Sequence, residues 1–196
     1  MGEELASARS KLEEALTALR DADAPPAAVR ATELALAALG ARPGCEPYMS
    51  VGLALEDEGR YDVACDFYLE ALQREPTSAM GWTNLGEARR KLHRWGAALD
   101  AYDKALEQHP TYPWALAGRA EALRMTGRAE QAVTAFEQAL EHAPDHAFAV
   151  LGLAAALSEL GRQRHALPWW EKAIALQPES GFASDGLARC KSALEG

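Results

Sequence analysis

Two histidines four residues apart come nearer to a metal site than any other pair in this sequence. His142 and His146 have the spacing with which one helix can present two imidazoles to zinc. Pro144 lies between them, and a proline interrupts the helix that would have to carry both side chains. No carboxylate or cysteine stands at ligand spacing from the remaining histidines, which are His93, His109 and His165. We therefore expect no metal site.

Other patterns that carry chemistry are also missing from the sequence. The three cysteines, Cys45, Cys65 and Cys190, are widely separated and form no C-x-x-C pair, so they indicate neither a zinc site nor a disulfide framework. No nucleophile elbow, phosphate-binding loop or dinucleotide fingerprint occurs. The acidic run Glu56, Asp57 and Glu58 is typical of a solvated helix end. We expect no catalytic residues, no cofactor and no enzymatic activity.

Composition narrows the class of protein further. Of 196 residues, 48% are apolar and 25% are charged, as in ordinary globular proteins, and alanine and leucine dominate over valine and isoleucine, which favours helix. A net charge of −9 repels phosphate backbones and argues against nucleic-acid binding. No apolar run is long enough for membrane insertion, and the acidic first residues lack a signal-peptide core, so we expect a cytoplasmic protein. The excess of arginine over lysine hints at a GC-rich bacterial genome.

An internal repeat organises the chain. Prolines recur at one constant interval, at Pro76, Pro110, Pro144 and Pro178. Alignment on them divides the sequence into units 45–78, 79–112, 113–146 and 147–180. A unit of this length can form two helices joined by a tight turn, and one such hairpin cannot bury its apolar face alone. Neighbouring units must therefore stack on one another.

Several other positions repeat with the same period. Small residues occur at Gly52, Gly86, Ala120 and Ala154, and again at Ala64, Ala98, Ala132 and Ala166. Aromatic residues occur at Tyr68, Tyr102, Phe136 and Trp170. Small residues let paired helices approach closely, and large ones fill the space between them. The middle of each unit carries a glycine followed by arginine, at Gly59, Gly127 and Gly161, with His93 as the exception.

These columns resemble the tetratricopeptide repeat family, with its W-x-x-L-G, A-x-x-x-F-x-x-A and closing proline, over residues 45–180. The second unit carries the pattern as Trp82, Leu85, Gly86, Ala98, Tyr102, Ala105 and Pro110. The resemblance implies an all-α fold, a right-handed α-solenoid (superhelix) of stacked antiparallel helix hairpins. It also implies that the first helix of each unit lines a concave groove, and that this groove binds another protein.

The two ends of the chain depart from the repeat. Residues 1–44 are expected to form a degenerate hairpin that caps the array, with helices over 3–20 and roughly 26–39. Residues 181–196 are expected to form a single capping helix with a polar outer face. Alternatively, the leucines of the first helix could form a dimer seam. Their pattern lasts barely over two heptads, so we expect a monomer and keep the dimer as the alternative.

The positions that should face the groove give a candidate binding surface. One column holds large apolar residues, and the positions beside it are polar or charged. The candidate residues are Met80, Asn84, Glu87, Arg90, Lys91, Trp114, Glu121, Arg124, Phe148, Leu151 and Phe182. An apolar ladder of this kind suits an extended peptide or an amphipathic helix with apolar anchors. We hypothesise that Arg90, Lys91 and Arg124 receive a carboxylate from the partner.

Each of these features also has a structural interpretation. Large residues in the Met80 column can pack between repeats, and the cations near a helix C-terminus are favoured by the helix dipole. Some family members bind acidic chaperone tails through lysines and asparagines, but the matching positions here hold Met49, Leu53, Trp114 and Gly118, and only Asn84 fits. The chaperone-tail interpretation is therefore disfavoured.

Two departures from the pattern lie in the later units. Arg119 occupies an apolar column, so we expect its stem to be packed and its head to reach water or a carboxylate such as Glu121. Pro168 lies where a second helix should already be running, so that helix should kink or begin late. Leu167 and Trp169 beside it could form a second, convex contact patch.

Together these observations predict a non-catalytic scaffold or adaptor that binds a protein partner in its groove. The alternative is a dedicated chaperone that resembles the small repeat-containing chaperones of bacterial secretion systems. A folded regulator as partner would favour the scaffold, whereas an unfolded export client would favour the chaperone.

Overall fold

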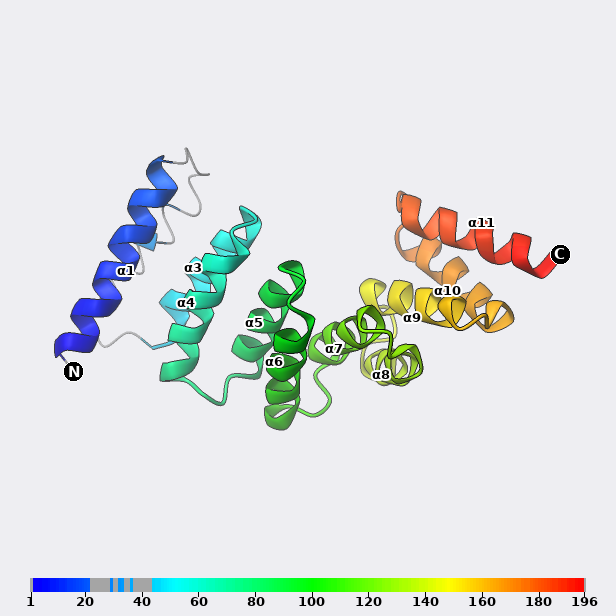
Figure 1. Cartoon of the computed structure of the whole chain (residues 1–196), viewed down its shortest axis with the longest axis horizontal. Helices are drawn as coiled ribbons and strands as arrows, with labels where there is room; N and C mark the ends of the chain where they lie inside the picture. The colour runs from blue at the N-terminus through cyan, green and yellow to red at the C-terminus, as the bar shows by residue number, and fades with distance from the viewer. Residues whose placement is uncertain (1, 22–28, 30–31, 34–35, 37–43, 196) are drawn as a thin grey trace. The chain divides into compact units, whose positions relative to one another are not determined.

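The protein is all-α in the residues that the structure, a computed structural model, describes: 2–21, 29, 32–33, 36 and 44–195. Helices follow one another along the chain and pack in consecutive pairs (Figure 1), which confirms the predicted fold class. The chain divides into two compact units, Met1–His93 and Arg94–Gly196. Each unit is described separately below.

The first unit is built on helices that bury small and aromatic residues. Its described helices are α1 (Gly2–Asp21), α3 (Glu46–Asp57), α4 (Tyr61–Arg74) and α5 (Ala79–Lys91). Leu12 and Leu19 of α1 are fully buried within the chain, and Lys11 forms an ion pair with Glu70 of α4. The expected second helix of the cap, 26–39, lies largely outside the described residues.

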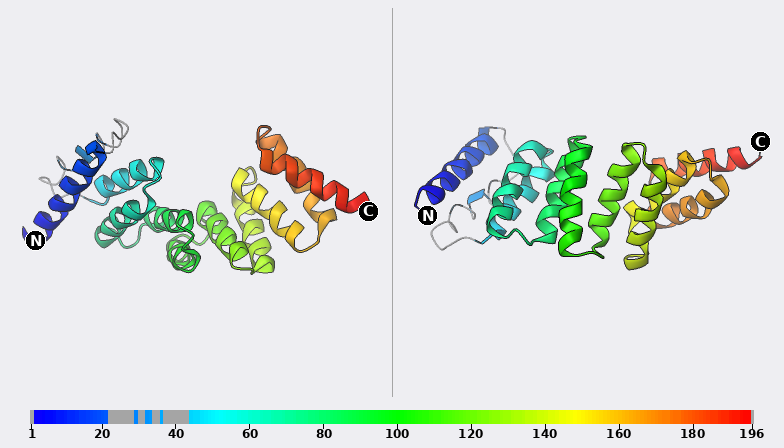
Figure 2. Two further views of the ribbon diagram at one scale, coloured as in Figure 1. Left: turned by 45° about the horizontal axis from the view of Figure 1, so that its top comes forward. Right: turned by 60° about the horizontal axis from the view of Figure 1, so that its bottom comes forward.

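The second unit is a succession of helices, each packed on the next (Figure 2). They are α6 (Trp95–Gln108), α7 (Pro113–Met125), α8 (Ala129–His142), α9 (Ala147–Glu159), α10 (Gln163–Leu176) and α11 (Gly181–Glu195). Beyond these sequential pairs, α7 also contacts α9, and α9 contacts α11. The odd-numbered helices therefore lie side by side as one layer and share one face of the unit.

The turns within three of the repeats share one hydrogen-bonded form. Gly59, Gly127 and Gly161 have φ values of 73°, 77° and 71°, in the left-handed region that glycine adopts without steric cost. The next residue then donates its amide back to the preceding helix, as from Arg128 to the carbonyl of Leu123 at 2.9 Å. His93 occupies this position in the remaining turn with φ 56°, so it adopts the backbone conformation of the glycines.

Aromatic rings of the second helices in unit 2 pack against glycines of the following helix. A Cβ built on Gly118 would lie 2.4 Å from the ring of Tyr102, and one on Gly152 would lie 2.2 Å from the ring of Phe136. Both rings are fully buried. Each ring therefore fills the space that a glycine leaves open, and this contact joins consecutive repeats.

Pro168 lies inside α10, near its middle. The helix nevertheless begins at Gln163, at the same place in the repeat as α4, α6 and α8, so the expectation of a late start was wrong. Its first turn carries an additional short-range bond, from the amide of His165 to the carbonyl of Arg162 at 3.0 Å. The proline is exposed, and the helix continues past it to Leu176.

A search of the described helices for membrane spans finds none with the necessary length and apolar character.

Candidate functional site

Large apolar side chains are exposed on the shared face of α7, α9 and α11. Trp114 of α7 and Phe182 of α11 are 55% and 54% exposed. Phe148 and Leu151, both on α9, are partly buried and pack against the core. Of the three unit 2 residues that the sequence assigned to the apolar ladder, Trp114, Phe148 and Phe182, two therefore present most of their surface to solvent. Exposed rings gain little from folding and are available for contact with another molecule.

The indole of Trp114 is flanked by other rings. Its ring centroid lies 5.4 Å from that of Tyr112 and 5.6 Å from that of His146, and His146 lies 6.4 Å from Phe148. The contacts are tilted or edge-on, which is the favourable geometry for aromatic pairs. They hold the indole in place before any partner binds, so less side-chain freedom remains to be lost on binding.

His146 has a structural role at the start of α9. Its Nδ1 accepts a hydrogen bond from the amide of Ala149 at 3.3 Å and so caps the helix. His142 belongs to the end of α8. Among the described residues, no group of three or more histidine, cysteine, aspartate or glutamate side chains is placed to hold a metal ion.

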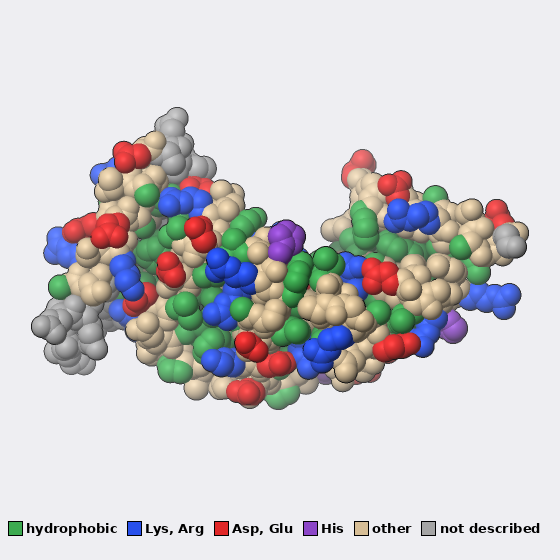
Figure 3. All heavy atoms as spheres, viewed as in Figure 1, with side chains coloured by type: hydrophobic (Ala, Val, Ile, Leu, Met, Phe, Trp, Pro, Cys, Tyr) green, Lys and Arg blue, Asp and Glu red, His purple; other side chains and the backbone are tan. Residues whose placement is uncertain are grey.

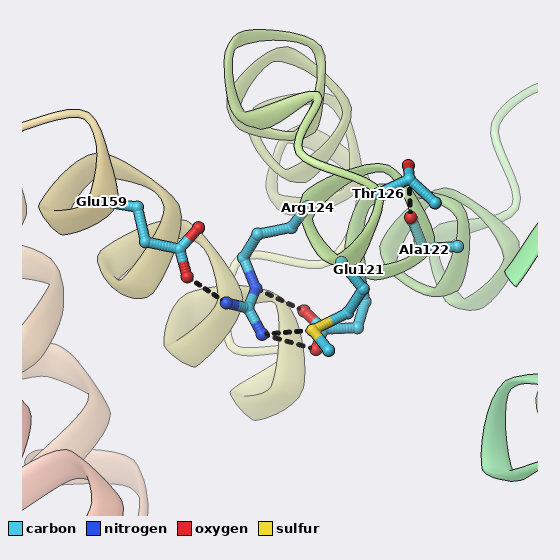
Figure 4. Close-up of polar contacts among 6 residues, drawn as sticks. Glu121, Ala122, Arg124, Thr126 and Glu159 are labelled. Atoms are coloured by element: carbon cyan, nitrogen blue, oxygen red, sulfur yellow. Dashed lines mark hydrogen bonds and ion pairs between the residues drawn. The ribbon is translucent and has the colours of Figure 1, made fainter. Parts of the chain in front are cut away.

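Arg124 bridges two of the helices that share this face (Figure 4). Its Nε and Nη2 atoms donate to the two carboxylate oxygens of Glu121 at 2.8 Å each, and its Nη1 atom donates to Glu159 of α9. The side chains of Arg124 and Glu121 are only 16% and 14% exposed. Bonding to Glu121 raises the pKa of Arg124 above its ordinary value. Arg124 thus fastens α7 to α9.

These contacts bear on the hypothesis that the cations receive a partner carboxylate. Arg124 already has two carboxylates of its own chain, with which a partner would have to compete. In unit 1, Arg90 donates to Glu87 at 2.8 and 3.1 Å, while Lys91 is exposed. The two arginines are therefore occupied within the chain, a feature that their helical columns did not reveal.

The other unit 1 candidates differ in exposure. Met80 is more than half exposed at the start of α5, and Asn84, one turn later, is partly buried. Met80 is thus the apolar candidate of this unit that is available for contact.

The acidic run of Glu56, Asp57 and Glu58 is not the solvated helix end that the sequence predicted. Only Asp57 of the three is exposed, while Glu56 and Glu58 are partly buried. Burial, with a smaller contribution from the like charge of Glu87, raises the pKa of Glu56 to about 7. The run was misread because the side of α3 that faces α5 cannot be identified from three consecutive acidic residues.

Arg119 finds a carboxylate, but not the expected one. Its Nε donates to Asp103 of α6 at 2.6 Å, whereas Glu121 is bonded to Arg124. The guanidinium is partly exposed, as expected for a packed stem with a polar head. The partner lies on the preceding helix, so spacing within one helix could not identify it.

The proposed convex patch offers less free surface than the exposed rings. Leu167 and Trp169 are both partly buried and pack against the core of unit 2. They lie on α10, beside the fully packed Trp170.

A hollow of about 390 Å³ opens between α9, α10 and α11 and was not foreseen from the sequence. Figure 3 shows hydrophobic side chains gathered in this part of unit 2, with charged side chains beside them. Its wall includes Trp170, Phe182 and Gly186. The glycines at positions 118, 152 and 186 recur with the period of the prolines, so a signal for ring-against-glycine packing was present in the sequence.

Models of the tetratricopeptide repeat match three overlapping or adjoining parts of the chain, residues 46–78, 77–145 and 117–181. Together they cover 46–181, well over half of the sequence. No curated protein sequence matches the chain.

Solved structures with the same arrangement of helices include three of interest. MamA has a TM-score of 0.66 and 20% identity, over 77% of this chain and 82% of that one. YrrB, described as having an unusual peptide-binding site, has a TM-score of 0.61 and 23% identity, over 72% and 73%. The first repeat domain of Spaghetti (RPAP3), bound to an HSP90 peptide, has a TM-score of 0.58 and 22% identity, over 60% and 94%. At these identities the likeness establishes the fold alone.

Proposed function

The chain belongs to the tetratricopeptide repeat family, and on this premise we propose that it is a non-catalytic interaction scaffold for another protein. The partner is a peptide or an amphipathic helix with apolar anchors. It binds in the groove of the first helices, with the face shared by α7, α9 and α11 as the principal contact in unit 2.

The observation that carries the proposal is the exposure of Trp114 and Phe182 on that face. Each ring is more than half exposed, although Ala115 and Leu116 beside Trp114, and Ala183 beside Phe182, are buried. Burying such a ring against a partner contributes about 1.5–3 kcal/mol, offset by the free energy needed to order the partner. Two anchors of this kind suit a specific complex of moderate affinity.

The thiols of Cys45 and Cys190 are unsuited to act as nucleophiles. Burial, helped by the nearby carboxylate of Glu75, raises the pKa of Cys45 to about 11, and burial also raises the pKa of Cys190. Both thiols are therefore protonated at neutral pH, which makes them poor nucleophiles.

Two structural neighbours lend support at the level of class. YrrB is described by its peptide-binding site, and the Spaghetti domain holds an HSP90 peptide. The partner of this chain is not an acidic chaperone tail. Binding such a tail requires polar side chains at positions that here hold Met49, Leu53 and Gly118.

Selection from a displayed library of random dodecapeptides tests the proposal without knowledge of the natural partner. The full chain is compared with a Trp114→Ala/Phe182→Ala double variant and with Leu194→Ala, which removes another exposed apolar side chain of α11. Circular dichroism verifies the helicity of each variant. We expect wild type and Leu194→Ala to enrich peptides with large apolar residues, and the double variant to lose them.

Equal enrichment by all three proteins would contradict the assignment of this face. In that case Leu167 and Trp169 would be the next positions to replace. Failure of the wild type to enrich any peptide would contradict the scaffold function in the form proposed.

A further inference from the structure

The hollow between α9, α10 and α11 has an apolar wall made of two rings. The centroids of Trp170 and Phe182 lie 5.7 Å apart with an edge-on geometry. Trp170 is almost entirely buried, whereas more than half of Phe182 is exposed. The indole N–H of Trp170 donates to the hydroxyl of Ser158 at 2.9 Å, so the polar edge of this ring is satisfied within the chain. The wall therefore offers hydrocarbon surface to whatever enters the hollow.

The charged side chains that line the hollow differ in their availability. Arg124 and Glu159 are bonded to each other, and Arg124 is also held by Glu121. Arg189 of α11 lines the same hollow and is exposed. Within the part of the chain that the structure describes, no carboxylate lies within ion-pairing distance of its guanidinium. Helix α11 thus carries both Phe182, the exposed ring, and Arg189, a cation available to a partner, at the edge of the hollow.

Phe182 and Arg189 are seven positions apart on α11, which corresponds to two helical turns. Side chains seven apart lie on the same face of a helix, about 10.5 Å apart along its axis. A partner segment can reach both with an apolar side chain and a carboxylate about three residues apart if it is a polyproline II helix, in which every third side chain shares a face, or seven apart if it is α-helical.

We propose that this hollow recognises a partner segment that combines one large apolar side chain with one carboxylate. The apolar side chain packs on the exposed ring of Phe182, which Trp170 supports from beneath, and the carboxylate pairs with Arg189. The proposal rests on the scaffold function above and specifies the chemistry of its partner. A longer acidic run is disfavoured, because the whole chain carries a net charge of −9.

Arg124 has a different part in this arrangement. Its guanidinium is occupied by Glu121 and Glu159, and it positions α7 against α9 rather than contacting the partner. The sequence-based hypothesis of a carboxylate received by Arg124 is thereby replaced, in unit 2, by one received by Arg189.

The test again uses selection of displayed dodecapeptides, now on the full chain and on Arg189→Glu. We expect wild type to enrich aspartate or glutamate at a fixed spacing from a large apolar residue. Arg189→Glu should keep the apolar preference and replace the acidic residue by lysine or arginine. Arg164→Glu, which introduces the same charge at an exposed α10 position that does not line the hollow, should select the same peptides as wild type.

One enriched peptide is then synthesised with a fluorescent label, together with its version in which the acidic residue is replaced by the neutral amide. Fluorescence anisotropy measures its affinity for wild type and for Arg189→Gln. Either single change should weaken binding about fivefold, and the two together should weaken it little more, because both remove the same interaction.

Apolar enrichment without a charge preference, or an acidic preference unchanged in Arg189→Glu, would overturn the assignment of Arg189 while leaving the scaffold function intact. Independent, additive effects in the anisotropy cycle would overturn it as well. If wild type enriches no peptide, the scaffold function itself fails, and this proposal fails with it.

Discussion

The indole of Trp170 lies directly against Gly186, where an added Cβ would come within 2.5 Å of the ring. The same relationship joins Tyr102 to Gly118 and Phe136 to Gly152. In each case a ring from one repeat occupies the space left by a glycine in the next. The contact therefore belongs to the boundary between repeats, and the stability of unit 2 depends on it.

Replacement of Gly152 by alanine should destabilise the protein by about 1–3 kcal/mol, because the new methyl group would overlap the buried ring of Phe136. Urea unfolding followed by circular dichroism measures the change. Gly96→Ala is the matched control, since a Cβ at that helical position meets nothing within 4 Å. It should leave stability unchanged or raise it by about 0.5–1 kcal/mol. Equal effects at both glycines would contradict the packing argument.

Truncation of an exposed tryptophan should cost much less stability than truncation of a buried one. Trp114→Ala should change the free energy of unfolding by less than about 1 kcal/mol, because more than half of its surface is already in water. Trp170→Ala should cost about 3–5 kcal/mol, because it leaves a cavity in the core. Thermal unfolding of both variants decides the matter. A large loss of stability in Trp114→Ala would show that its ring serves the fold rather than binding.

Arg124→Met should lower the free energy of unfolding by about 1–3 kcal/mol, because it leaves the carboxylate of Glu121, only 14% exposed, without its guanidinium partner. Glu159→Gln removes the charge from the second contact at a side chain that is 46% exposed, so it should cost less than about 1 kcal/mol. Chemical denaturation of both variants at low salt gives the comparison. If Glu159→Gln proves the more harmful change, the bond to Glu121 is not the principal one.

Stability should depend on pH through Glu56. Burial raises its pKa to about 7 in the folded protein, above the ordinary value of 4.5. A group with a raised folded pKa contributes stability that is fully present below its ordinary pKa and is lost as the pH rises through the folded value. Glu56→Gln should therefore raise the melting temperature at pH 8 and reduce the decline between pH 5 and pH 8. Asp57→Asn, at an exposed neighbour, should leave that decline in place.

Pro168→Ala should stabilise the protein. The alanine restores an amide that can bond to the carbonyl of Arg164 within α10, and the proline ring that it replaces is exposed. A gain of about 1–3 kcal/mol is expected from the cost of proline in a helix interior. The melting temperature relative to wild type measures it. A loss of stability would mean that the helix is shaped around the proline.

The repeat and the all-α fold could be predicted because their signals are local and recur. A proline at a constant interval, with a small residue and an aromatic at fixed offsets, defines two helices and the turn between them. Helix pairs follow from this pattern because each element's apolar face can be identified from spacing within that element. Even His93, which departs from the glycine of the other turns, adopts the left-handed backbone that the turn requires.

The partners of charged side chains could not be predicted in the same way. Arg119 pairs with Asp103 on the preceding helix, and Arg124 reaches Glu159 on α9, the first helix of the next repeat. Which carboxylate an arginine pairs with depends on which turn of the neighbouring helix lies opposite the arginine. Spacing within one helix carries no information about that alignment. For the same reason, burial of Glu56 against α5 was missed.

The packing of aromatic rings against glycines could have been predicted from the sequence, because these glycines recur at a fixed interval. Gly118 was interpreted as the absence of a polar group needed to hold an acidic tail. Its repetition at Gly152 and Gly186, each at the same offset from the aromatic of the preceding repeat, fits a packing role instead.

The contact between a ring and the next repeat's glycine also makes the array modular. Consider a duplicate of one repeat inserted between His146 and Ala147. The glycine of the duplicate would receive the ring of the repeat before it, and the ring of the duplicate would pack on the glycine of the repeat after it. No core side chain would need to change to accommodate it. Lengthening or shortening by whole repeats is therefore compatible with the packing of unit 2, and a change in array length would alter the reach of the binding face without redesign of its interior.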